Sequence, residues 1–185
     1  MSLDSSRQEV LSQCKFYSLP PFFSVQRVEE TRQRQLAMWL ELLMNWQQVN
    51  CFSLVSVSTQ RMEIPFRNDA IDRGLSAQDM CTVLDYCIAE GYGFWLGADH
   101  EHCVLSWHTI QDWAQLLHTW AVEAGLAGQL STIYELRAGD ATRGEEFHGL
   151  DGRLIKAALD LMVKQQLCTL IIVDSVDETG VKWVG

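Results

Sequence analysis

Apolar residues recur every three or four positions in four stretches of the chain, a spacing that places them on one face of a helix. The pattern predicts a first helix that begins at residues 29–31 and a second that runs from Ser76 to Gly91. The third ends at Gly125, and the fourth begins at Asp151. Serine and aspartate cap the first turn of helices, and glycine adopts the left-handed conformation that ends them, so these residues fit the predicted boundaries.

Short runs rich in β-branched and aromatic residues lie between the helical stretches and predict strands. Two β-hairpins are expected, at residues 94–107 and 168–184, and residues 52–57 predict a further strand. A brief helix is expected over residues 65–71, because it would begin with a proline and proline suits a first helical turn. Residues 130–136 are compatible with either a strand or a tight helical turn.

The order of these elements repeats along the chain. Residues 29–107 and residues 108–185 span 79 and 78 positions, and each reads helix, strand, short helix or turn, helix, hairpin. This is the order of a winged-helix domain. We therefore predict an α+β protein with two tandem winged-helix domains, at residues 29–107 and 108–185.

Residues 1–28 precede the first domain and carry Tyr17 and the run Pro20-Pro21-Phe22-Phe23. Adjacent prolines are expected to prevent a helix and to hold an extended path. Each phenylalanine ring buried in a partner's pocket would contribute about 1.5–3 kcal/mol. We expect this segment to be a docking arm, and the alternative is that it folds back over its own first domain.

Charge argues against nucleic acid as the main ligand. The 185 residues carry 24 acidic and 14 basic side chains, a formal net charge of -10. The excess of acids is five in each half of the chain, and the helix from Ser76 to Gly91 contains three acids and no base. A phosphate backbone or an anionic lipid surface would be repelled by this field. A winged-helix nucleic-acid-binding regulator is kept as the competing class.

No motif for metal or cofactor chemistry is complete. His100, His102 and Cys103 lie close together, but Cys81 and Cys87 are six positions apart and would point to different faces of a helix. The spacing of zinc ligands is absent. A glycine pattern at residues 91–97 follows a helix and precedes a strand, which inverts the order of a dinucleotide fingerprint. We expect no cofactor, no metal and no enzymatic activity.

The cysteines and the N-terminus indicate a compartment. Six scattered cysteines without a C-x-x-C pair, a polar N-terminus without an apolar signal core, and no run of 18 apolar residues predict a cytoplasmic protein that does not insert into a membrane.

Several short runs resemble the vacuolar protein sorting-associated protein 25 family. They are Tyr17-x-x-Pro20-Pro21-Phe22-Phe23, Thr31-Arg32-x-x-Gln35-Leu36-x-x-Trp39, Trp113 and Trp120, Thr132-Ile133-Tyr134-Glu135-Leu136, Glu145-Glu146-Phe147-His148-Gly149-Leu150-Asp151, and Gly180-Val181-Lys182-Trp183. The runs extend from Tyr17 to the C-terminus in the family's order. The sequence departs from the family at residues 137–144 and at its last two residues.

The resemblance implies a scaffold subunit of the ESCRT-II complex, in which two copies join one copy each of two larger winged-helix subunits, of the vacuolar protein sorting 22 and 36 types. The family's Pro-Pro-x-Phe motif falls on Pro20, Pro21, Phe22 and Phe23, and Tyr17 belongs to the same docking segment. The implied role is sorting of ubiquitinated cargo into multivesicular bodies, at the endosomal membrane to which the complex is recruited.

The resemblance also implies that the second domain binds the N-terminal helix of an ESCRT-III subunit of the vacuolar protein sorting 20 type. Candidate contacts are Phe147, Leu150 and Lys156, and Phe147 is equally compatible with a core position.

Overall fold

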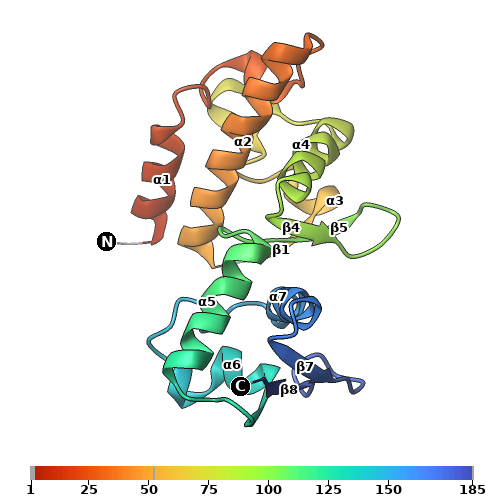
Figure 1. Ribbon diagram of the computed structural model, residues 1–185. Helices are drawn as coiled ribbons and strands as arrows, with labels where there is room; N and C mark the ends of the chain where they lie inside the picture. Colours follow the sequence, from red (N-terminus) through yellow and green to blue (C-terminus); the bar gives the residue numbers. More distant parts are fainter. Residues whose placement is uncertain (1–2, 52, 185) are drawn as a thin grey trace. The chain divides into compact units, whose positions relative to one another are not determined.

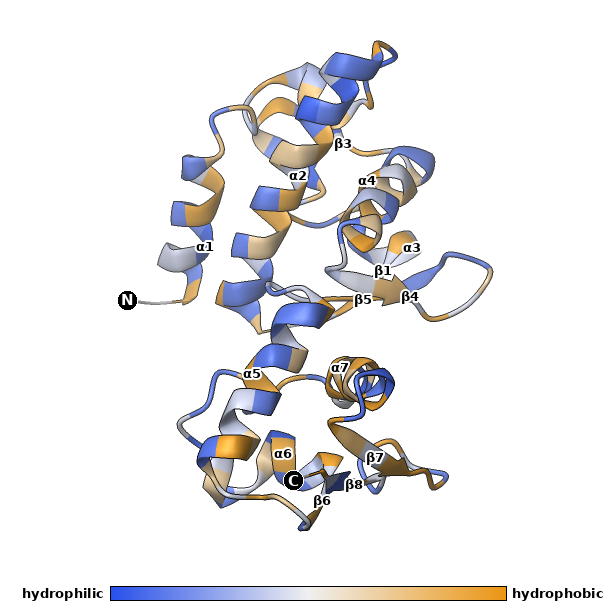
Figure 2. Cartoon of the chain, viewed as in Figure 1, coloured by the Kyte–Doolittle hydropathy of each residue, from blue (hydrophilic) through white to orange (hydrophobic). Residues whose placement is uncertain are grey.

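The structure is a computed structural model that describes residues 3–51 and 53–184 (Figure 1). The chain divides into two compact units, Met1–Trp107 and His108–Gly185. Figure 2 shows that apolar residues alternate with polar ones around the helices of both units, which is the pattern of helices that bury one face.

Unit 1 combines helices with two small antiparallel sheets. Its helical segments are α1 (Leu3–Gln13), η1 (Pro20–Phe23), α2 (Glu29–Asn50), α3 (Val57–Gln60), η2 (Asp69–Ile71) and α4 (Ala77–Ala89). Its strands are β1 (Leu54–Ser56), β2 (Arg67–Asn68), β3 (Arg73–Gly74), β4 (Gly93–Trp95) and β5 (His102–Leu105). The strands form a sheet of order β1-β5-β4 and a separate β2-β3 pair.

The predicted boundaries of the long helices of unit 1 are confirmed. α2 begins at Glu29. The hydroxyl of Ser76 accepts a hydrogen bond from the Asp79 backbone N–H at 3.0 Å and so caps α4. Gly91, with φ of 90°, follows the last turn of α4 in the left-handed conformation. The hairpin of β4 and β5 lies where the sequence predicts it, and Phe52 of the expected first strand lies outside the described residues.

The helix expected over residues 65–71 is wrong, because α3 ends before Pro65 and the chain after it forms the β2-β3 pair around η2. The side-chain oxygen of Asn68 accepts a hydrogen bond from the Ala70 N–H at 3.0 Å. Arg67 forms ion pairs with both aspartates of the turn. These local side-chain bonds favour a turn over a continuing helix.

Unit 2 repeats the order of unit 1. It contains α5 (Ile110–Glu123), β6 (Leu130–Thr132), α6 (Ile133–Ala138), η3 (Asp140–Thr142), α7 (Gly152–Lys164), β7 (Cys168–Ile171) and β8 (Gly180–Trp183). The sheet order is β6-β8-β7, and all its pairs are antiparallel. Residues 130–136, which the sequence leaves open between a strand and a helical turn, form both: β6 is followed directly by α6. The two units are tandem winged-helix folds.

Reciprocal capping fixes where the helices of unit 2 begin. The Thr109 hydroxyl accepts a hydrogen bond from the Asp112 N–H, and the Asp112 carboxylate accepts one from the Thr109 N–H. Thr132 and Glu135 repeat this capping box at α6. Asp151 caps α7, as its position in the sequence predicts. These bonds satisfy N–H groups that a first helical turn leaves without partners.

Candidate partner-binding site

The Pro-Pro-Phe-Phe run is a short 3₁₀ helix, so the expected extended path is wrong. Pro20 and Pro21 occupy the first positions of η1, where a helix does not need their missing N–H groups. The Phe22 N–H donates to the Leu19 carbonyl at 3.0 Å, and the Ser24 N–H donates to the Pro21 carbonyl at 3.4 Å. Two adjacent prolines can therefore open a helical turn, although they cannot lie inside a long helix.

Both phenylalanine rings lie in the hydrophobic core of unit 1. Phe22 and Phe23 are only 4% and 3% exposed. The Phe22 ring stacks on the Trp39 indole, with ring centres 4.4 Å apart and an interplanar angle of 8°. Phe23 meets the same indole edge-on at 5.7 Å. The structure thus favours the alternative in which the segment folds back over its own domain, since neither ring is available on the surface.

Gln35 holds the segment in place, and the sequence pattern did not reveal this role. Its helical spacing suggests the polar face of α2, yet the side chain is only 3% exposed. Its amide N–H₂ lies within 2.9–3.1 Å of the carbonyl oxygens of Pro21, Phe22 and Ser24, and its oxygen accepts a hydrogen bond from the Gln26 N–H at 3.0 Å. A possible signal was its position one helical turn before Trp39, on the same side of the helix.

Trp39 adds a further bond to the same stretch of backbone. Its indole N–H donates to the Phe22 carbonyl at 3.1 Å. Trp39 is fully buried, and the rings of Phe22 and Phe66 lie on it at 4.4 and 6.2 Å. A single tryptophan of α2 therefore orders η1 through both packing and hydrogen bonding.

Tyr17 ties the start of the segment to the β2-β3 pair. Its hydroxyl donates to the Arg67 carbonyl at 2.8 Å, and its own carbonyl accepts a hydrogen bond from the Asn68 side chain at 2.9 Å. Burial raises the pKa of Tyr17 above its usual value, and the negative charge of Asp69 adds to this effect. The hydroxyl is a structural donor, which stays protonated at neutral pH.

The opposite side of the segment is exposed and apolar. Phe16 and Leu19 are 45% and 47% exposed, and Pro20 and Pro21 also lie on the surface. We call these four residues the N-terminal face. Beside it lies an open groove of about 420 Å³, whose walls include Phe16, Leu19, Pro21 and Met38. An exposed apolar patch with an adjacent groove is typical of a protein interaction site.

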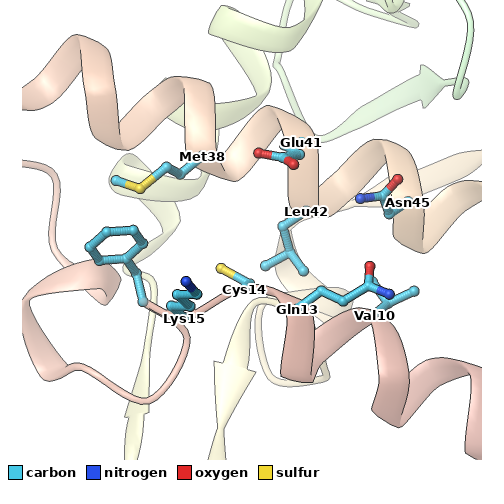
Figure 3. A pocket seen from close by; sticks show the side chains of 9 residues that line it. Val10, Gln13, Cys14, Lys15, Met38, Glu41, Leu42 and Asn45 are labelled. Atoms are coloured by element: carbon cyan, nitrogen blue, oxygen red, sulfur yellow. The ribbon is translucent and has the colours of Figure 1, made fainter.

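A smaller cavity lies on the other side of Phe16, between α1 and α2. Figure 3 shows Met38 and Leu42 of α2 on one side of it and Val10 and Cys14 on the other. Its volume is about 160 Å³. Burial raises the pKa of the Cys14 thiol, which keeps the thiol in its unreactive protonated form. The cavity is a small packing gap beside α1.

The structure places the candidate residues of unit 2 in different environments. Phe147 and Leu150 are 1% and 3% exposed, and the Phe147 ring lies edge-on to Trp120 at 5.5 Å. Both are core residues, and not the surface contacts that the resemblance implies. Lys156 is half-buried on α7, and its ammonium group pairs with Asp160 at 2.9 Å. The structure does not bring these three side chains together into one surface.

Unit 2 also has an apolar groove between α5 and the end of β8. Its volume is about 380 Å³, and its walls include Val122, Leu167, Trp183 and Val184. Val122 is 65% exposed and Val184 is 53% exposed. A groove of this kind suits the apolar face of a helix.

The described residues contain no group of three or more histidine, cysteine or acidic side chains placed to hold a metal ion. Burial raises the pKa of Cys87 and of Cys103 to about 12, and that of Cys168 to about 11, so these thiols stay protonated. No helix within the described ranges combines the length and apolar character that crossing a membrane requires.

Comparison with known proteins relates the chain to one family. The model of the ESCRT-II complex subunit family matches residues 16–151. Vacuolar protein sorting-associated protein 25 of Arabidopsis thaliana is 34% identical over 170 residues, which cover 91% of this chain and 93% of that protein. The protein of the same name from Homo sapiens is 30% identical over 167 residues, covering 90% and 94% of the two chains.

Solved structures show the same fold. Subunit VPS25 of the endosomal trafficking complex ESCRT-II matches with a TM-score of 0.79 and 21% identity, over 92% of this chain and 97% of that one. A chain of the ESCRT-II endosomal trafficking complex matches with a TM-score of 0.78 and 22% identity, over 94% and 99%.

Proposed function

Because the chain belongs to the family of ESCRT-II complex subunits, we propose that it is a non-catalytic adaptor of ESCRT-II in the endosomal sorting of ubiquitinated cargo to multivesicular bodies. A related structure contains VPS25 together with VPS22 and VPS36. The corresponding partners of this chain are larger subunits of the VPS22 and VPS36 types.

The N-terminal face is the proposed docking surface for those subunits. The observation that carries this assignment is that the segment has one buried side and one exposed side. Phe22 and Phe23 are held inside by Gln35 and Trp39, while Phe16, Leu19 and the prolines are exposed on a fixed turn. An ordered turn loses little conformational entropy on binding, so its exposed apolar side chains can contribute most of their burial energy to affinity.

We assign the contact with an ESCRT-III subunit to unit 2. The apolar groove that contains Val122 and Val184 can receive the apolar face of that subunit's N-terminal helix. Lys156, on the surface of α7, remains a candidate for a charged contact. Two copies of the chain in one complex would raise the avidity for such a partner, provided that both can bind at once.

The acidic charge of the chain is compatible with this role and not with nucleic-acid binding. Each unit has five more acidic than basic residues, whereas a winged-helix nucleic-acid regulator typically presents a basic face. The proposed location is the cytoplasm, with recruitment to the endosomal membrane through the assembled complex.

Co-expression with tagged larger subunits tests the docking surface. We expect Leu19→Asp to abolish co-purification, because it places a charge in the centre of the N-terminal face. Met62→Asp is the matched control, since Met62 is 55% exposed in the same unit and lies outside this face. Circular dichroism should show both variants folded. Normal co-purification of the folded Leu19→Asp variant would refute the assignment.

A further inference from the structure

The sheet of unit 2 ends in an open edge strand. In the order β6-β8-β7, β7 pairs only with β8, so alternate residues of β7 direct their backbone N–H and C=O groups away from the sheet. Residues 168–173 contain no charged residue, proline or glycine. Natural edge strands often carry charged residues or proline, because these discourage pairing with another chain. This edge lacks that protection.

The side chains along this edge are also apolar and exposed. Ile171, Ile172 and Val173 are 52%, 70% and 44% exposed. Figure 2 shows β7 as one of the apolar segments of unit 2. Single exposed apolar residues are ordinary, but three in succession at an unpaired edge mark an interaction site or an aggregation hazard.

The equivalent edge of unit 1 differs. β4 is the edge strand of the sheet β1-β5-β4, and its last residue is Trp95. The His100 ring stacks on Trp95 with centres 4.5 Å apart, and the Trp95 indole N–H donates to the Asp85 carboxylate at 2.8 Å. The hairpin loop of unit 1 thus contacts the large side chain at the end of its own edge strand and leaves one exposed aliphatic residue, Leu96, beyond it. β7 ends in the exposed Ile171, and two more exposed aliphatic residues follow.

The exposed apolar surface continues from β7 across the outer face of the unit 2 sheet toward β6. Ile171 pairs with Gly180 of β8, and Thr132 of β6 pairs with the same glycine. A Cβ atom at Gly180 would lie 3.3 Å from the Ile171 Cβ and 3.5 Å from a methyl group of Leu130. Ile171 and Leu130 therefore flank a position without a side chain, and Leu130 is 63% exposed.

We propose that β7 pairs with β7 of a second copy of this chain, antiparallel and with Ile171 opposite its own counterpart. This register joins two three-stranded sheets into one of six strands. Side chains alternate between the faces of a strand, so Thr169 and Ile171 share the outer face of β7, and Val173 joins them where the pairing extends the strand by two residues. In this register Thr169 lies opposite Val173 of the other copy, and the apolar patches of the two copies become continuous.

The charges near the two ends of β7 favour a second copy of the chain as the partner. Lys182 pairs with Thr169 near the start of β7, and the exposed residues Asp174 and Glu178 follow its other end. Antiparallel pairing brings the acidic end of each copy to the basic end of the other. Unit 2 has five more acidic than basic residues, and repulsion between charges farther apart than about 8 Å is largely screened at physiological ionic strength.

Sedimentation equilibrium of the full chain tests the pairing. At ~100 µM, within the range of weak specific association, we expect a species of about 42 kDa, twice the 21.1 kDa of one chain. Ile171→Lys places two like charges opposite each other and should weaken the association at least tenfold. Tyr134→Lys, at a 57% exposed residue of α6 in the same unit, should leave it unchanged. A monomeric wild type would overturn the proposal, and so would equal behaviour of the two variants.

Cysteine cross-linking tests the register. Directly opposed residues of antiparallel strands have Cα atoms about 4.5–5.5 Å apart, within reach of a disulfide. In a Cys51→Ser background, which removes an exposed native thiol, Ile171→Cys should form covalent dimers on mild oxidation, whereas Tyr134→Cys should not. Association without this cross-link, or growth into larger assemblies, would reject the two-fold pairing of β7. A strand from another protein at this edge would leave the chain monomeric in both experiments.

Discussion

Replacement of Phe22 by alanine distinguishes a core residue from a docking residue. The ring is 4% exposed and stacks on Trp39 at 4.4 Å. Removal of a fully buried phenylalanine costs about 3–5 kcal/mol, through lost transfer energy and the cavity that remains. η1 is a single turn near the N-terminus and can partly collapse into the space. We therefore expect Phe22→Ala to lower the free energy of unfolding of unit 1 by about 3 kcal/mol.

Urea unfolding followed by circular dichroism measures this loss. Hydrogen exchange read by mass spectrometry then shows whether the loss is confined to unit 1, where peptides from η1 and α2 should exchange faster. Phe16→Ala is the matched control, because it removes the same side chain from the same segment at a position that is 45% exposed. That control should cost under about 1 kcal/mol, since an exposed ring has little burial energy to lose.

One result would refute this reasoning. If Phe22→Ala unfolds within about 0.5 kcal/mol of the wild type, the difference expected for an ordinary surface substitution, the ring is not part of the core in solution. If the same variant also fails to bind the larger subunits, the segment docks with its phenylalanines outward, as the sequence alone suggests.

Three other substitutions test separate contacts. Gln35→Ala should destabilise unit 1 by about 2 kcal/mol in urea unfolding, because it removes the buried amide that bonds three carbonyl groups of the segment and accepts from the Gln26 N–H. Asp151→Asn should cost about 1 kcal/mol at pH 7, since hydrogen bonds from Arg153 outweigh burial and lower the Asp151 pKa. This contribution is present above the unfolded pKa near 4 and is lost as pH falls through the lower folded pKa, so the difference in unfolding energy between variant and wild type should shrink steadily as the pH is lowered below about 4. Gly93→Ala should lower the melting temperature by at least about 5 °C, because its Cβ would lie 1.9 Å from the Val104 carbonyl oxygen.

The periodicity of the sequence predicts most of the fold because each long helix buries one face. Ser76 and Asp151 mark helix starts through the hydrogen bonds they accept, and those bonds are local. Pro65 misleads because the conformation after it depends on the side-chain bonds of Asn68 and Arg67, which favour a turn. A proline is compatible with a helix start but does not require one.

The candidate partner-binding site was harder to predict, because contacts between residues distant in the sequence determine which of its side chains face the core and which face the surface. The sequence identifies the Pro-Pro-Phe-Phe run as unusual, but the path of that run is fixed by Gln35 and Trp39 on another helix. The prediction of Phe147 as a surface contact fails for a related reason, since only the packing of Trp120 against it shows that it belongs to the core. Residue type and spacing indicate that a ring will be buried, but they do not show which surface buries it.

The two proposed surfaces should act independently, because each is built on its own unit. The hydrophobic core that holds the N-terminal segment consists of residues of unit 1, and the β7 edge belongs to the sheet of unit 2. Effects at sites without shared partners usually add within about 0.5 kcal/mol. The double variant Leu19→Asp, Ile171→Lys should therefore lose binding of the larger subunits and self-association by the same factors as the single variants. A loss of self-association in Leu19→Asp alone would show that the two units communicate, and it would contradict the separation of roles on which both assignments depend.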